Sequence, residues 1–166
     1  MGAGQGTLTF MVGGDPGDFA AAQIYFEAMG KTITHCGPVG SGQAVKMCNQ
    51  ILCASNLVGI CEAMLLAEAQ GIDPQLVVDV CGTGAAGSWA LSNLGLKVAQ
   101  GDFKPGFMIK HILKDLRLVR EIARAQNQDL PGTTFADGLF QWVAAHGGSE
   151  SGTQAMIRAY REQSDS

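Results

Sequence analysis

Residues 43–70 constrain the fold more than any other part of the chain, because they read as one long helix that is apolar on most of its circumference. Its apolar side chains are Val45, Met47, Cys48, Ile51, Leu52, Leu57, Val58, Ile60, Cys61, Met64, Leu65 and Leu66. A helix that is apolar nearly all round is a buried one. At 1.5 Å per residue it would be roughly 40 Å long. We therefore expect either the central helix of a helical domain or part of a subunit interface.

The first residues predict a short β-α-β unit. Residues 7–12 and 31–35 read as strands. Asp15-Pro16 can start a helix through about Met29, since proline is well placed in a first turn. Two strands and one helix cannot readily bury both faces of a sheet. The strands can therefore pair with each other, exchange with another copy or stay partly disordered.

The remaining residues predict further helices. Pro105 holds a loop at residues 101–107, and Gly147-Gly148 ends a helix that begins near Pro131. The predicted segments are residues 88–99, 108–126, 131–145 and 149–161. With 46% hydrophobic residues, the 166-residue chain can bury a core. The fold class is therefore mainly α, with β structure only near the N-terminus.

Residues 76–87 allow two structures. Read as a strand followed by Gly82-x-Gly84-x-x-Gly87, with Asp102 further along for a ribose contact, they match a dinucleotide fingerprint. Read as a helix, they follow Asp73-Pro74, which is a good cap and first-turn pair. We favour the helix, because no convincing second strand leads into Asp102. The alternative predicts that this chain alone binds a dinucleotide.

Composition argues against several partners. The formal net charge is -4 and the Lys and Arg residues form no continuous run, so we expect neither a nucleic-acid partner nor an anionic membrane surface. No segment reads as a membrane-spanning run. The five cysteines lie in apolar surroundings without a C-x-x-C pair, and the three histidines are far apart in sequence. We expect buried, reduced thiols and no metal site.

A glycine-rich turn leads into the long helix. Gly40 and Gly42 allow a backbone to approach a ligand closely, and Ser41 can cap the helix. Lys46 follows about one turn later, with Asn49 and Gln50 on its face at the third and fourth positions beyond it. A surface lysine on an ordinary capped helix would show the same short pattern.

The whole segment Gly37-Pro38-Val39-Gly40-Ser41-Gly42-Gln43-Ala44-Val45-Lys46-Met47-Cys48-Asn49-Gln50 resembles the catalytic signature of the β-hydroxyacid dehydrogenases. Residues 6–15, Gly-Thr-Leu-Thr-Phe-Met-Val-Gly-Gly-Asp, and residues 103–116 resemble the same family in the same order. The family includes 3-hydroxyisobutyrate dehydrogenase, tartronate semialdehyde reductase and the glyoxylate/succinic semialdehyde reductases. These enzymes transfer hydride between NAD(P) and a small β-hydroxyacid or semialdehyde.

The resemblance covers nearly the whole chain and implies its domain organisation. It implies a helical bundle of the 6-phosphogluconate dehydrogenase C-terminal-domain type at residues 38–166, built around the one long buried helix. Residues 1–37 would be a β-α-β remnant of the N-terminal nucleotide-binding domain. On this interpretation the chain is a C-terminal fragment that is inactive in isolation. The residues determine neither the compartment nor the choice between NAD and NADP.

The resemblance also implies roles for individual residues. Lys46 would be the general acid/base, and the substrate would be bound by Gly40, Ser41, Gly42, Asn49 and Gln50. The family often places an asparagine four positions after the lysine. This chain has Asn49 at three and Gln50 at four, which leaves open which amide binds the substrate oxygen.

Phe107, Lys114 and Asp115 match cofactor-side residues of the family, with NAD or NADP as the cofactor. Phe107 could equally be packed in the core, and Lys114-Asp115 could be a solvated surface pair. The expected partners are a small hydroxyacid or semialdehyde and further copies of the chain, joined through the helical domain. The rival interpretation is a non-catalytic dimerisation module derived from the same fold.

Overall fold

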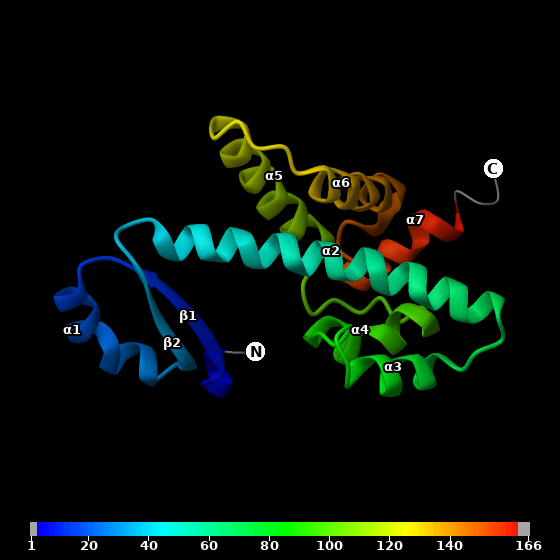
Figure 1. Ribbon diagram of the computed structural model, residues 1–166, viewed down its shortest axis with the longest axis horizontal. Coiled ribbons are helices and arrows are strands. Elements are labelled where there is room, and N and C mark those ends of the chain that lie inside the picture. Colours follow the sequence, from blue (N-terminus) through cyan, green and yellow to red (C-terminus); the bar gives the residue numbers. More distant parts are fainter. Residues whose placement is uncertain (1–2, 163–166) are drawn as a thin grey trace. The chain divides into compact units, whose positions relative to one another are not determined.

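The computed structural model describes residues 3–162 and divides the chain into two compact units, one up to Asn49 and one from Gln50 onward (Figure 1). Helix α2 (Ser41–Ala69) begins in the first unit and continues into the second. The first unit contains η1 (Ala3–Gln5), β1 (Leu8–Gly13), α1 (Pro16–Glu27) and β2 (Gly30–Gly37). The mainly helical fold with an N-terminal β-α-β segment confirms the predicted fold class.

The two strands of the first unit pair with each other, which decides among the three possibilities left open by the sequence. The pairing is parallel, with Phe10 opposite Ile33. A parallel pair needs a crossover connection, and α1 supplies it. Asp15 caps this helix as predicted, since its carboxylate accepts a hydrogen bond from the Gly17 amide at 2.7 Å. The rings of Phe10 and Phe26, 4.9 Å apart, pack α1 on one face of the strand pair.

Backbone contacts without side chains join the end of β1 to the start of α2. A Cβ atom on Gly42 would collide with the carbonyl group of Met11, and one on Gly13 would lie 2.7 Å from the Pro38 oxygen. Only glycine permits this approach. The Gly40 carbonyl accepts the first intrahelical bond, from the Ala44 amide at 3.0 Å. Gly40 therefore occupies the cap position, and Ser41 is the first helical residue rather than the expected cap.

The long helix packs through one stripe. Its buried apolar residues follow one another at helical spacing, as expected for one helix face, and they are Ala54, Leu57, Ile60, Cys61, Met64 and Ala67. Leu52 and Leu66 are 61% and 64% exposed. The predicted long central helix is present, and within the single chain one of its faces is buried in the core of the second unit while other apolar side chains stay exposed.

By length and composition alone, α2 could cross a membrane, so the expectation that no segment would pass this test is corrected. The core helix of a globular protein passes the same test. The stripe of buried residues that ends with Met64 and Ala67 shows that α2 packs against protein in the second unit.

The second unit is built from short helices around this stripe. They are α3 (Pro74–Gly82), α4 (Trp89–Gln100), α5 (Ile109–Ala125), α6 (Pro131–Val143), η2 (Ala144–Gly148), η3 (Thr153–Met156) and α7 (Ile157–Arg161). Phe140, Ile109, Ile112, Leu116 and Met156 are among its fully buried side chains. The single helix predicted at residues 149–161 is instead a loop, the short turn η3 and α7. The amides of Gly152 and Thr153 bond to carbonyls of a distant loop rather than along a helix.

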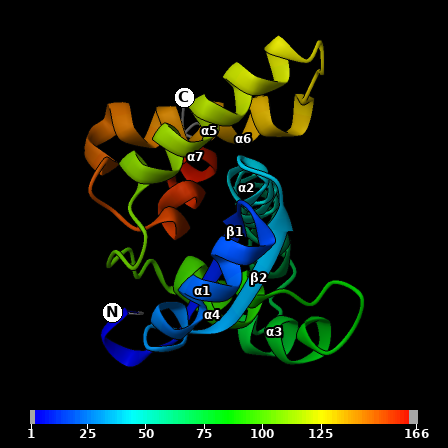
Figure 2. The ribbon, with the colours of Figure 1, turned by 90° about the vertical axis from the view of Figure 1, so that its left-hand side faces the viewer.

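The alternative prediction of a dinucleotide-binding strand and loop at residues 76–87 is wrong, because the residues expected to form the strand lie in helix α3. Asp73 caps α3 by accepting a hydrogen bond from the Gln75 amide at 2.9 Å. The glycine-rich residues that follow form a tight turn, in which the Gly87 amide donates to the Gly84 carbonyl at 2.9 Å. Ser88 then caps α4. The turn joins two helices that lie side by side (Figure 2).

The thiols differ from the expectation of general burial. Cys48 and Cys53 are exposed, Cys36 and Cys81 are half-buried, and only Cys61 is buried. Burial, followed by the negative charge of Glu62, raises the pKa of the Cys61 thiol to about 12. Apolar neighbours in sequence do not bury a residue on the outer face of a helix.

Candidate functional site

The first unit has an open pocket of about 400 Å³ between β1 and the start of α2. Its lining residues are Thr9, Phe10 and Met11 on the strand and Gly42, Gln43, Lys46 and Asn49 on the helix. The helical residues follow one another at intervals of one, three and three positions, which places Gly42, Lys46 and Asn49 on one face. The close approach of Gly42 to Met11 brings this face next to the strand.

This pocket combines groups that can hold and protonate an oxygen atom. Lys46 provides an ammonium group with three donors, and Asn49 provides an amide with donors and an acceptor. Lys46 is exposed and Asn49 is half-buried, so a small molecule in the pocket can reach both. A proton donor within hydrogen-bond reach of a substrate oxygen is what general acid/base chemistry requires.

The predicted substrate-binding residues do not all line this pocket. Gly42 and Asn49 do, whereas Gly40 and Ser41 lie just before it, at the start of α2. Sequence reasoning missed four of the lining residues, Thr9, Phe10, Met11 and Gln43. The three strand residues belong to the segment 6–15 that resembles the family, but only the packing of β1 against α2 shows that they border the pocket.

Gln50 takes part in a different group, within the second unit. Its side-chain Nε2 donates to Oδ2 of Asp115 at 2.6 Å, across 65 positions of sequence. Nζ of Lys114 lies 2.6 Å from the other carboxylate oxygen of Asp115. Gln50 is 3% exposed. The side chain of Lys114 is 59% exposed and that of Asp115 only 16%. The structure thus brings one predicted substrate residue together with two predicted cofactor residues.

Phe107 lies in the loop before α5, whose cap is Met108. The stretch from Phe107 to Asp115 is therefore helical only from Ile109 onward. Phe107 is 42% exposed, so burial in the core does not account for it. Its ring stacks on that of His111, with centroids 5.9 Å apart. An exposed aromatic ring and the exposed ammonium of Lys114 have the chemistry that a nicotinamide ring and a nucleotide phosphate require.

Within residues 3–162, no cluster of three histidine, cysteine, aspartate or glutamate side chains could hold a metal ion.

Comparison with known proteins decides the family. Residues 40–160 match the family described as "NAD-binding of NADP-dependent 3-hydroxyisobutyrate dehydrogenase". The chain belongs to the 3-hydroxyisobutyrate dehydrogenase family. Residues 1–37 match a second family, described as the NAD binding domain of 6-phosphogluconate dehydrogenase. The family uses NAD(P), which agrees with the resemblance inferred from the sequence.

Individual relatives of this 3-hydroxyisobutyrate dehydrogenase family member are similar over almost its whole length. An uncharacterized oxidoreductase of Synechocystis sp. is 57% identical over 162 residues, covering 98% of this chain and 55% of the relative. The 2-hydroxy-3-oxopropionate reductase of Escherichia coli is 40% identical over 159 residues, covering 96% of this chain and 54% of the relative. The chain thus spans about half the length of these curated relatives.

A solved structure of Mycobacterium tuberculosis 3-hydroxyisobutyrate dehydrogenase with L-serine has the same fold. Its TM-score is 0.88 at 34% sequence identity, covering 96% of this chain and 57% of that one. The helical arrangement described above is therefore that of the family.

Proposed function

We propose that this chain provides the acid/base half of an NAD(P)-dependent oxidoreductase that interconverts a small β-hydroxyacid and its semialdehyde. The observation that carries the proposal is the pocket in which Lys46 and Asn49 face β1. Two relatives support the substrate class. One is named for the reduction of 2-hydroxy-3-oxopropionate, and the structure of the other contains L-serine. Both molecules are small hydroxyacids, of a size that a pocket of about 400 Å³ can hold.

In the proposed reduction, the Lys46 ammonium group donates a proton to the substrate carbonyl oxygen as hydride reaches the carbonyl carbon. The product is a hydroxyl group, and Lys46 is left neutral. In the oxidation, neutral Lys46 takes the hydroxyl proton as hydride leaves the carbon. The amide of Asn49 donates a hydrogen bond to the same oxygen and holds it beside Lys46. NAD(P), when bound, supplies or accepts the hydride.

We assign different tasks to the two neighbouring amides. Asn49 lines the pocket with Lys46 and binds the substrate oxygen. Gln50 is buried and donates to Asp115, so it orients that carboxylate instead. Asp115 in turn holds the ammonium group of Lys114, which would face the cofactor phosphates. Phe107 would pack against the nicotinamide ring.

We expect the 166-residue chain by itself to show no turnover. Hydride transfer needs a cofactor held in register with the substrate, and positioning accounts for much of the rate in such reactions. The family relatives contain about as much sequence again as this chain covers. Activity should appear when the preceding half of the Synechocystis relative is joined to this chain, because the two proteins are 57% identical over the shared region.

The test is turnover of this chimaera with 2-hydroxy-3-oxopropionate and NADH or NADPH. Lys46→Ala should lower kcat by about a thousandfold, since general acid/base catalysis contributes roughly 10²–10⁴-fold. The matched control is Lys97→Ala, an exposed lysine in the last turn of α4. It should leave kcat unchanged, and circular dichroism should show both variants folded. Wild-type turnover by Lys46→Ala would overturn the proposal.

We also propose that copies of the chain associate through the helical part. Leu52, Leu66 and Trp89 are more than half exposed in the single chain, and an association that covered them would be favourable. This feature also supports the rival function, a non-catalytic dimerisation module. Light scattering coupled to gel filtration measures the association, and the Lys46→Ala assay separates the two functions, because a pure assembly module has no turnover to lose.

A further inference from the structure

Gln154 is the most deeply buried polar residue among the described residues of the second unit, with 2% exposure. Its Nε2 atom donates to the carbonyl oxygens of Asp102 and Lys104, each at 2.9 Å. A side-chain amide nitrogen has two hydrogens, so both are used on the backbone of a loop about 50 residues away. That loop, residues 101–107, carries Phe107 at its end.

The residues around Gln154 hold the same loop through their backbones. The amide of Gly152 donates to the Phe103 carbonyl at 2.9 Å, and that of Thr153 donates to the Phe107 carbonyl at 3.0 Å. Met108 and Gly152 form an isolated antiparallel bridge. The carbonyl group of Phe107 itself is therefore bonded to the segment that contains Gln154.

Gly152 lets the Gln154 side chain fold back over the backbone. A Cβ atom at Gly152 would lie 2.7 Å from both the side-chain carbon and the nitrogen of the Gln154 amide. No larger residue fits at position 152 with this amide in place. Gly152 and Gln154 thus form one clamp, in which the glycine makes room for the amide and the amide binds the loop.

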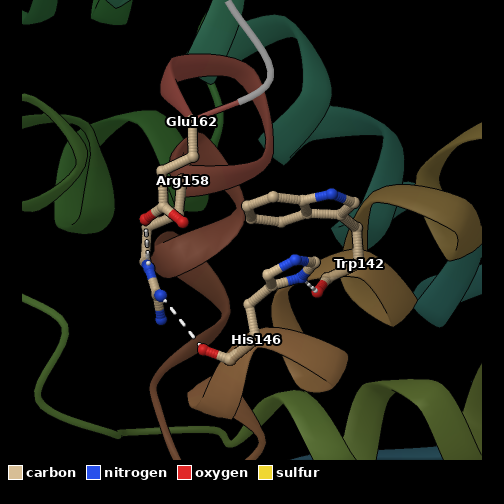
Figure 3. A network of polar contacts seen from close by, with 4 residues as sticks. All are labelled: Trp142, His146, Arg158 and Glu162. Carbon is tan, nitrogen blue, oxygen red and sulfur yellow. Dashed lines mark hydrogen bonds and ion pairs between the residues drawn. The ribbon is translucent and has the colours of Figure 1, made fainter. Parts of the chain in front are cut away.

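Further contacts join the segments that flank the clamp to each other and to α6. The His146 ring stacks on Trp142 with centroids 3.8 Å apart, and its Nδ1 lies 2.7 Å from the Trp142 carbonyl oxygen (Figure 3). Nη2 of Arg158 on α7 donates to the His146 carbonyl at 3.1 Å, while its Nε pairs with Glu162 at 3.0 Å. These contacts lie six residues before Gly152 and four residues after Gln154.

We propose that Gln154 is a positioning residue, which fixes loop 101–107 and thereby sets where Phe107 meets the cofactor. The inference rests on the proposed function, in which Phe107 contacts the nicotinamide ring. Phe103 packs against the core, whereas Lys104, Pro105 and Gly106 are exposed, so the core holds only the start of this loop. The bonds from Gln154 and its neighbours anchor it instead.

The first test uses the chain itself. Gln154→Met has a similar length and no donors, so it leaves two loop carbonyls without their partner. Amide hydrogen exchange at Gly152 and Thr153 should become at least about tenfold faster, while exchange in the buried stripe of α2 stays unchanged. The matched control is Gln128→Met, an exposed glutamine whose amide is 3.4 Å from the carbonyl of nearby Gln126. Equal exchange in all three proteins would overturn the proposal.

The second test uses the chimaera described above, with a double-mutant cycle as the readout. Gln154→Met should raise the KM for the nucleotide about tenfold and change kcat less. In a Phe107→Ala background it should have no further effect, because Gln154 acts through Phe107. A merely structural role would give additive effects and overturn the proposal. No turnover by the unmodified chimaera would overturn the proposed function and, with it, the cofactor role of the clamp.

Discussion

The ion pair between Arg120 on α5 and Asp137 on α6 allows a quantitative test of how burial strengthens an interaction. Asp137 is 3% exposed and accepts a second hydrogen bond, from Nε2 of Gln141 at 2.7 Å. Arg117 and Glu121 on α5 form an ion pair at 2.9 Å, with side chains 64% and 52% exposed. Both pairs join an arginine to a carboxylate, and they differ in burial and in the second hydrogen bond that Asp137 accepts.

Asp137→Ala removes two hydrogen bonds to a charged acceptor, each worth roughly 1.5–3 kcal/mol. It also leaves the Arg120 guanidinium without its partner. That side chain is 30% exposed and can be solvated again. The free energy of unfolding should therefore fall by about 3 kcal/mol, near the lower end of the range for breaking a buried pair. Glu121→Ala should cost no more than about 0.5 kcal/mol, as exposed pairs do.

Urea unfolding, followed by circular dichroism and by the fluorescence of Trp89 and Trp142, of which Trp142 lies on α6, measures both values. With a slope of about 2 kcal/mol per molar urea, Asp137→Ala should lower the midpoint by about 1.5 M and Glu121→Ala by about 0.2 M. The combined replacement Arg120→Met, Asp137→Leu should recover much of the loss, since an apolar pair needs no counter-charge.

Equal midpoint shifts for Asp137→Ala and Glu121→Ala would refute this reasoning. They would mean that burial adds nothing to the strength of the Arg120–Asp137 pair. Failure of the apolar replacement to recover stability would place the energy in the hydrogen bonds rather than in the cost of leaving Arg120 unpaired.

Two further predictions concern α2. Gly42→Ala should destabilise the first unit by about 1–3 kcal/mol, because the added Cβ meets the Met11 backbone. Gly59→Ala has open space around its Cβ and should stabilise the helix by up to about 1 kcal/mol. Hydrogen exchange of the β1 amides distinguishes the two variants, and equal effects on it would contradict the steric argument. Folding raises the pKa of Cys61 from 9.0 to about 12, so between these pH values the folded chain keeps a proton that the unfolded chain releases. The free energy of unfolding is therefore unaffected by this thiol below pH 9 and falls between pH 9 and about pH 12. Urea titrations over that range should show a loss of up to about 1.4 kcal/mol per pH unit that Cys61→Ala lacks, and identical slopes would rule it out.

Local patterns in the sequence were sufficient to predict most of the secondary structure. Asp15 and Asp73 cap their helices, each followed by proline in the first turn, as their side chains and positions predict. The capping contact joins residues two positions apart, so it depends little on the rest of the fold. Local spacing was also enough to place Lys46 and Asn49 on one face of α2. The cap at Asp73 was enough to predict a helix at residues 74–82 rather than a nucleotide-binding strand.

Tertiary structure alone decided how these elements combine into candidate sites. The contact of Gln50 with Asp115 spans 65 positions, and that of Gln154 with the loop before α5 spans about 50. No periodicity encodes such pairs, because they depend on how helices pack once the apolar stripe of α2 is buried. The same holds for Thr9 beside the Lys46 pocket and for the exposure of Cys48. The sequence determines which face of an element is apolar, whereas the packing of one element on another determines what that face touches.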